Sequence, residues 1–213
     1  VGIPVVPDFG SVLDPSIYGG EVVYPENAPP SMEPVIESPE QVPELIEKMR
    51  RERDILSLGL APKMLEWRDR MKEKTGRPVP VGFAIKGPAT MAGHICGMTQ
   101  LMMYLTTHPE EMKALIRCIG RTTIRFVRAL RRRAGLPGIT LMMANDMAGL
   151  VSPQMYHDFF KPVEKRIFNA LCPLKQGRFY HADSRMNHQL ENLNDLKPGI
   201  VNLGPTLTVK EIR

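Results

Sequence analysis

The sequence predicts an α/β fold, and within that class a (β/α) barrel, from three observations. Short strand-like segments that are apolar throughout alternate with helical segments of ten residues or more, which is typical of parallel βα units covered on both faces. Polar residues directly follow these strands, where a barrel carries its active site. Periodicity does not separate a barrel from a doubly wound sheet, but no glycine-rich phosphate loop follows any strand, which weakens the second alternative.

Proline, capping and apolar patterns indicate the elements before residue 106. Prolines throughout the first forty residues indicate extended and looping structure, broken by strand-like pieces. Ser38 is an N-cap candidate with Pro39 at the first helical position and Gln41 at the capping-box position, so a helix begins here. Gly76 stops the next helix, and an apolar strand then ends at Lys86. The expected elements are strands over 1–6 and 21–24, a helix from 39, a helix over 61–74, a strand over 78–85 and a helix over 93–105.

Helices and strands continue to alternate beyond residue 106. Thr107 caps a long amphipathic helix with Pro109 at its first position. Ser152 begins another helix, which Pro162 interrupts, and Thr208 opens a further capping box. The expected elements are a helix over 107–134, a strand over 139–144, a helix from 152, strands over 178–180 and 200–203, and a helix from 208.

The composition is that of an ordinary globular protein, with 43% hydrophobic and 24% charged residues and a net charge of +5. No apolar run reaches the length of a membrane span, and we see no secretion signal, so we expect a cytoplasmic protein without a membrane partner. Three cysteines, odd in number and far apart, are expected to be buried thiols in a reducing compartment. An arginine-rich helix end is better explained as a solvated helix terminus than as a nucleic-acid site.

The domain organisation is expected to be one (β/α) barrel domain over residues 1–213, cut at both ends. A closed eight-stranded barrel typically needs about 250 residues, and the sequence offers only about five convincing strands. A partial barrel exposes an unpaired sheet edge, which favours a homo-oligomer.

Polar side chains collect after the predicted strands. His181 and Asp183 are two residues apart at the end of a strand, so alternation places both on one face and directs them to one point in space. An imidazole and a carboxylate so arranged form a two-pronged ligand or acid/base site. The alternative is that they only cap the next helix. Lys86 follows an earlier strand, and Asn145 and Asp146 follow another.

Asp146 ends an apolar strand, so burial should raise its pKa unless a cation such as Lys86 lies near, and either arrangement suits acid/base work. The alternative is a cap for the following turn. Asn187 and His188 lie one turn beyond Asp183 and are expected to orient the ligands. The residues expected to bind substrate are Lys86, Asn145 and Asn202.

Several of these segments together resemble a known superfamily. They are Val81-Gly-Phe-Ala-Ile-Lys-Gly-Pro-Ala-Thr, then Asn145-Asp-Met-Ala-Gly-Leu-Val-Ser-Pro with Tyr156, Phe159 and Pro162 in the helix after it, and then His181. Together with residues 19–24 and 34–40 they resemble the uroporphyrinogen decarboxylase superfamily over most of the chain. The resemblance implies a (β/α)8 TIM barrel. It implies either a porphyrin decarboxylase or a zinc- and corrinoid-linked methyltransferase.

The resemblance is closer to the methyltransferase branch. The decarboxylases have an arginine-rich N-terminal segment, a tyrosine where this chain has His94 and a serine where it has Asp146. In the methyltransferases, His181 matches the first ligand of a His-x-Cys plus distant Cys zinc site. Asp183 stands at the second position here, and a third ligand would lie beyond Arg213. Zinc accepts nitrogen and oxygen donors, and a carboxylate in place of a thiolate favours an oxygen or nitrogen substrate.

Three functional hypotheses follow from the residues and the resemblance. The first is a methyltransferase that moves a methyl group between a small O- or N-methyl substrate and a corrinoid protein. In it, His181 and Asp183 hold zinc, and Asp146 and His94, expected at the barrel mouth, are catalytic. The second is decarboxylation of a tetrapyrrole, in which Lys86 attracts the acidic substrate. The third is a non-catalytic barrel fragment or subunit.

Overall fold

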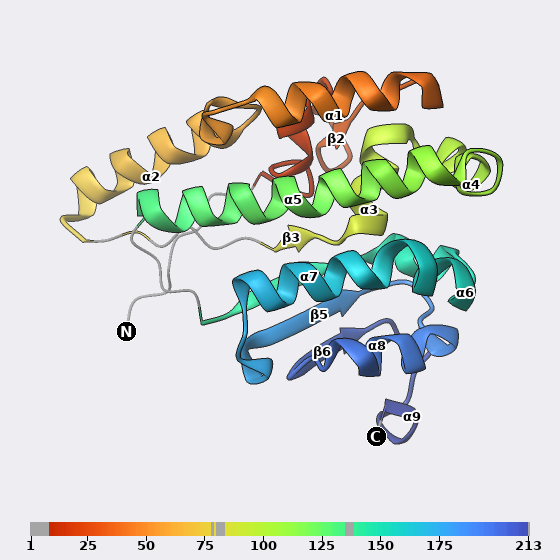
Figure 1. Cartoon of the computed structure of the whole chain (residues 1–213). Helices are drawn as coiled ribbons and strands as arrows, with labels where there is room; N and C mark the ends of the chain where they lie inside the picture. Colours follow the sequence, from red (N-terminus) through yellow and green to blue (C-terminus); the bar gives the residue numbers. More distant parts are fainter. Residues whose placement is uncertain (1–8, 78, 80–83, 135–138, 213) are drawn as a thin grey trace.

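The computed structural model describes residues 9–77, 79, 84–134 and 139–212, and its centre is a four-stranded sheet. All strand pairs are parallel and the strands follow chain order across the sheet, so helices cross over between them (Figure 1). The α/β prediction is thereby confirmed. The strands of the sheet are β3 (Ile85–Lys86), β4 (Leu141–Ala144), β5 (Arg178–Ala182) and β6 (Ile200–Leu203).

The helices lie along one side of this sheet, and the core fills the space between them. Figure 1 shows α5 and α7 running side by side, with α7 and α8 over β5 and β6. A short antiparallel pair, β1 (Val22–Val23) and β2 (Ser31–Met32), lies apart from the main sheet. The helices are α1 (Val42–Arg51), α2 (Ala61–Thr75), α3 (Pro88–Cys96), α4 (Met98–Thr107), α5 (Pro109–Ala134), α6 (Pro153–Met155), α7 (Lys161–Leu171), α8 (Leu190–Leu196) and α9 (Val209–Ile212).

The register of the sheet decides which side chains share a face. Tyr180 is fully buried, and its hydroxyl lies 3.3 Å from that of Tyr156 in the helical turn that precedes α7, so its side of β5 faces the helices. His181 therefore points to the opposite face. Paired residues of parallel strands project to the same side, and the pairing runs from Lys86 to Ala144, then to His181, then to Asn202. One row of residues across all four strands thus faces away from the helices.

Most predicted helix ends are confirmed. The capping box at Ser38 is present, and the helix that follows is α1. α2 ends at Gly76, which adopts φ 64°, a left-handed conformation that favours glycine. At α9, the backbone amide of Thr208 donates to the Glu211 carboxylate at 2.8 Å. The predicted strand over 1–6 and most of the strand over 78–85 lie outside the described residues.

Two predicted helices differ in detail. The helix expected from residue 93 begins at Pro88 and breaks at Gly97, whose φ of 80° cannot continue a helix. The helix expected from Ser152 is capped as predicted, because its hydroxyl accepts from the amide of Met155 at 3.1 Å. The interruption near Pro162 is a π-helical turn, Tyr156–Phe160, that leads directly into α7.

The arginines near the end of α5 do more than the sequence suggested. Arg125 donates to the carbonyl of Met49 at 2.7 Å and also to that of Glu52, and Arg131 donates to the carbonyl of Leu171 at 2.6 Å. These guanidinium groups therefore tie the C-terminal ends of α1 and α7 to α5. A merely solvated helix terminus is not the right description.

The predicted thiols are confirmed as buried and free at Cys96, Cys118 and Cys172. Among the described residues, no helix combines the length and apolar content that crossing a bilayer requires.

Candidate functional site

Three potential metal donors meet at the carboxyl ends of β4 and β5. Asp146 follows β4, His181 lies within β5 and Asp183 follows β5, and their nearest donor atoms all lie within 4.8 Å of one another. The Nε2 atom of His181 is 3.5 Å from Oδ2 of Asp183. His181 and Asp146 are partly buried, whereas the side chain of Asp183 is 77% exposed. We call these three residues the donor cluster. It combines one imidazole nitrogen with two carboxylates and is open to solvent on one side.

Hydrogen bonds hold two of the donors in place. The backbone amide of Asp183 donates to Oδ1 of Asp146 at 2.7 Å, which ties the ends of β4 and β5 together. His181 Nδ1 lies 2.9 Å from Oδ1 of Asn202, the residue of β6 that pairs with His181 in the sheet. An amide oxygen only accepts, so His181 donates from Nδ1 and keeps the lone pair of Nε2. That lone pair is on the side of the ring nearer Asp183.

Asn145 does not join the donor cluster, although it precedes Asp146. Its side chain has no exposed surface and is bonded on every side to protein groups. The amide nitrogen donates to Glu164 at 2.7 Å and to the hydroxyl of Tyr180 at 3.1 Å, and the amide oxygen accepts from the amide of Thr90 at 3.0 Å. A side chain in this position offers nothing to a substrate, so we assign it to the core.

A second polar group surrounds the end of β3. The backbone amide of Lys86 donates to Oδ2 of Asp14 at 2.7 Å. Burial raises the pKa of Asp14 to about 6, although the amide and the charge of Lys86 oppose this. For His94, burial first and the charge of Lys86 second lower the pKa to about 4, so its imidazole is neutral at neutral pH. His94 and Lys86 lie outside the donor cluster.

Sequence reasoning missed Asp14. An aspartate directly before Pro15 indicates a turn cap, but here the side chain makes no cap hydrogen bond. It reaches instead to β3, far along the chain, and is buried. The signal in the sequence was the apolar pair Val12 and Leu13 directly before Asp14. In the structure both are buried, so this part of the proline-rich segment packs into the core.

Asn187 and His188, which were expected to orient the ligands, bond to loop carbonyls instead. The side-chain amide of Asn187 donates to the carbonyl of Thr206 at 3.0 Å, and His188 Nε2 lies 3.1 Å from the carbonyl of Val151. Neither bond reaches the donor cluster. The residue that orients a ligand of the donor cluster is Asn202, through its bond to His181.

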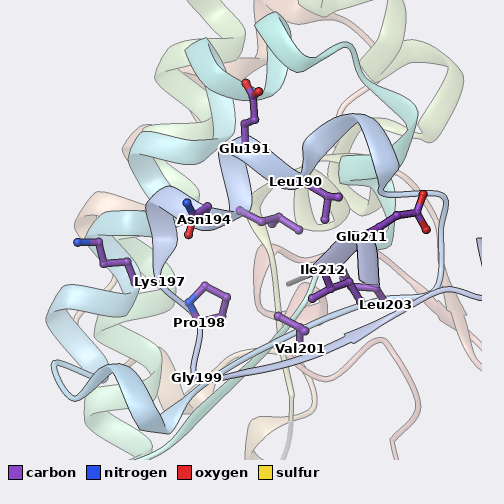
Figure 2. Close-up of a pocket in the computed structure, with 11 residues that line it drawn as sticks. Leu190, Glu191, Asn194, Lys197, Pro198, Gly199, Val201, Leu203, Glu211 and Ile212 are labelled. Atoms are coloured by element: carbon purple, nitrogen blue, oxygen red, sulfur yellow. The ribbon is translucent and has the colours of Figure 1, made fainter. Parts of the chain in front are cut away.

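A separate hollow of about 650 Å³ lies between α8, β6 and α9 (Figure 2). Val201 and Leu203 line its floor, and Glu191 and Lys197 stand at its rim. Val201 pairs with Tyr180, whose side chain faces the helices, so this hollow is on the helix side of the sheet. The donor cluster lies on the other side, and none of the predicted site residues lines the hollow.

The sequence profile of the family described as Uroporphyrinogen decarboxylase (URO-D) matches residues 9–213. The chain belongs to the URO-D family. The predicted superfamily is thereby confirmed, and the parallel sheet with its covering helices is the α/β arrangement expected for that family's barrel.

Within the URO-D family, the chain is similar to methyltransferases of Methanosarcina mazei. It is 23% identical over 171 residues to a methylated-thiol–coenzyme M methyltransferase, covering 78% of this chain and 44% of that protein. A solved methyltransferase from the same organism has a TM-score of 0.72 at 19% identity, covering 93% of this chain and 56% of the other. The chain thus spans about half the length of the relatives that it matches, and the structural likeness supports the fold.

Proposed function

We propose that this URO-D family chain carries a zinc-binding site of a methyltransferase, with His181, Asp183 and Asp146 as the donors. The enzyme would move a methyl group between a small O- or N-methyl substrate and a corrinoid protein. The observation that carries the proposal is the convergence of three donor atoms within 4.8 Å at the carboxyl ends of two parallel strands. The similarity to methyltransferases supports the reaction class.

The donor set fits zinc in type, and the one donor pair formed by His181 and Asp183 also fits in spacing. Zinc binds imidazole nitrogen at 2.0–2.1 Å and carboxylate oxygen at 2.0–2.2 Å, so two ligands at tetrahedral angles are about 3.4 Å apart. The separation between His181 Nε2 and Asp183 Oδ2 is 3.5 Å. Three protein donors with one position open is the usual arrangement of a catalytic zinc site.

When bound, the metal supplies Lewis acidity to the heteroatom that gains or loses the methyl group. The two carboxylates make the donor set harder than one with thiolates, which favours an oxygen or nitrogen heteroatom. Asp183 is largely exposed, so a substrate can reach the cluster from its side. His181 is aligned by Asn202, and Asp146 is aligned by the amide of Asp183.

We propose different roles for Lys86 and His94, which lie near the end of β3. Lys86 lies in the same register row as His181, two strands away, which places the two backbones roughly 10 Å apart. We assign Lys86 to an anionic group of the substrate. Because the pKa of His94 is lowered to about 4, its neutral ring serves as a hydrogen-bond partner and not as a proton donor at neutral pH.

The test is the zinc content of the purified protein after dialysis, for the native chain and for Asp183→Ala. One zinc per chain that is lost in the variant supports the proposal. Asp158→Ala, an exposed aspartate outside the cluster, is the matched control and should keep the zinc. No zinc in the native chain after exposure to excess metal contradicts the proposal.

Tetrapyrrole decarboxylation remains the second candidate, because the family description names that activity and Lys86 offers a cation for a carboxylate. The two candidates differ in a direct binding measurement. A decarboxylase site binds a porphyrinogen analogue without added metal, and Lys86→Met weakens that binding. A methyltransferase site requires the donor cluster instead.

A further inference from the structure

We propose that Glu164 is a positioning residue for the donor cluster. Through Asn145, it fixes the turn after β4 that carries Asp146 to the other donors. The inference rests on the proposed function, since it assigns Glu164 an effect on metal binding. Glu164 itself lies on α7 on the helix side of the sheet and belongs to no part of the donor cluster.

Glu164 is a fully buried carboxyl group whose two oxygens are both bonded. Oε1 accepts from the side-chain amide of Asn145 at 2.7 Å, and Oε2 shares a hydrogen bond with the hydroxyl of Tyr156 at 2.5 Å. Among the described residues, no lysine or arginine forms an ion pair with it, and burial is the main influence on its pKa. A buried carboxyl group is costly unless it is hydrogen-bonded, so this group holds its two hydrogen-bond partners strongly in place.

The hydrogen bonds close into a network of four side chains. Asn145 donates its second amide hydrogen to the hydroxyl of Tyr180 at 3.1 Å, and the hydroxyls of Tyr156 and Tyr180 are 3.3 Å apart. The members come from α7, the π-helical turn, β5 and the end of β4. Both amide hydrogens of Asn145 are therefore committed to the interior, which leaves its oxygen directed the other way.

On that other side, Asn145 connects the ends of three strands. Its oxygen accepts from the amide of Thr90, in the helix after β3, at 3.0 Å, and its backbone amide donates to the carbonyl of His181 at 2.9 Å. Gly87 passes so close that an added Cβ would lie 2.2 Å from Cγ of Asn145. These contacts with β3, β4 and β5 hold the Asn145 side chain in one orientation.

Asp146 is the next residue in the chain, so its position depends on the fixed orientation of Asn145. Its carboxylate accepts from the amide of Asp183 at 2.7 Å, which completes the connection from the interior to the donor cluster. Metal ligands must be held to within about 0.5 Å of their productive positions. Loss of the Glu164 anchor frees Asn145 to turn, and Asp146 then loses its fixed place.

The experiment compares Glu164→Leu with the native chain in two measurements. The first is hydrogen exchange at the amides of Thr90 and Asp183, which are bonded to Asn145 and Asp146. The second is the dissociation constant for Zn²⁺ at a temperature where circular dichroism shows both proteins folded. We expect at least tenfold faster exchange at both amides and Zn²⁺ binding weakened by roughly 10- to 100-fold, as for other groups behind metal ligands.

Ile167→Ala is the matched control, because Ile167 is buried on the same helix but outside the network. It should lower the melting temperature without changing either measurement. Glu164→Gln keeps the shape and an acceptor for Asn145, and should restore both values to near those of the native chain. If Glu164→Leu does not fold, Tyr156→Phe, which removes one hydrogen-bond partner of Glu164, should show the same changes on a smaller scale.

Unchanged exchange at both amides in a folded Glu164→Leu chain overturns the inference, as does an equal change in Ile167→Ala. Fast exchange in Glu164→Leu combined with no Zn²⁺ binding by the native chain separates the two proposals. In that case the zinc site fails, while the positioning of Asp146 by Glu164 stands.

Discussion

His181 and Asn202 are opposite one another in the parallel pairing of β5 and β6, and the imidazole Nδ1 lies 2.9 Å from the amide oxygen of Asn202. The asparagine thereby selects the ring tautomer that leaves Nε2 free. Because the two residues sit on adjacent strands of one sheet, the bond depends on strand register and not on a loop.

Asn202→Ala should weaken Zn²⁺ binding by roughly 10- to 100-fold, because the imidazole loses the acceptor that fixes its orientation. Asn202→Asp retains an acceptor at the same place and should bind Zn²⁺ at least as tightly as the native chain. Isothermal titration calorimetry with Zn²⁺ measures both. Equal losses in the two variants would show that the amide nitrogen, and not the acceptor, matters.

The two carboxylates of the donor cluster should differ in importance. Asp146→Asn removes a donor that is partly buried and also bonded to the amide of Asp183, whereas Asp183→Asn removes an exposed one. We expect a larger loss of Zn²⁺ affinity for Asp146→Asn, by about tenfold over Asp183→Asn. Competition with a chromogenic chelator gives both constants, and the reverse order would contradict the assignment.

Glu164 should make the free energy of unfolding depend on pH. Burial raises its pKa from the ordinary 4.5 to about 8, so between these values the folded chain holds a proton that the unfolded chain has lost. Its stabilising contribution is present below pH 4.5 and is lost as the pH rises through 8, by at most about 1.4 kcal/mol per pH unit.

Asp14 contributes a smaller pH dependence of the free energy of unfolding, with the same sign, since burial raises its pKa from 3.8 to about 6. Between pH 6 and 8, the change in this free energy therefore comes mainly from Glu164. Urea unfolding of native and Glu164→Gln chains across this interval is the measurement. The native stability should fall with rising pH, and the variant should show a flatter profile. Parallel profiles would exclude Glu164 as the titrating group.

Gly87→Ala should destabilise the chain by about 1–3 kcal/mol, the usual range for an overpacked core, because its Cβ would meet the Asn145 side chain at 2.2 Å. Gly76→Ala is the comparison. No atom lies within 4 Å of its added Cβ, so only its left-handed backbone matters, at about 1–2 kcal/mol. Thermal unfolding compares them, and Gly87→Ala alone should also weaken Zn²⁺ binding.

The charge of Lys86 should be measurable at His94. The pKa of His94 is lowered to about 4, mainly by burial and secondly by Lys86. In Lys86→Met, the pKa of His94 should rise but stay below 6.5, since burial remains. Titration of the imidazole signals by NMR measures this, with exposed His157 as the internal control. An unchanged pKa would place the Lys86 ammonium away from the ring.

The strands and helices were largely predictable because their signals are local. Apolar runs located β4 and β6, and capping boxes located the starts of α1 and α9. The break at Gly97 was not predicted, because a glycine within a helical pattern is compatible with either outcome until its backbone conformation is known.

The candidate site was partly predictable for a similar reason. Alternation along β5 was enough to bring His181 and Asp183 together. The contact between Asp146 and Asp183 needed the order of strands in the sheet, which no single segment contains. The same alternation should have separated Asn145 from Asp146, because neighbouring residues at a strand end point to opposite faces, and the structure places Asn145 in the core.

Alternation in β5 has a consequence for any attempt to alter this chain by insertion or deletion. Tyr180 supplies a hydroxyl to the interior, and the next residue, His181, supplies an imidazole to the opposite face. An extra residue placed before Tyr180 would exchange the two faces, sending the imidazole among the helices and the phenol into solvent. Core and site would be lost together, so we expect β5 to tolerate no change in length.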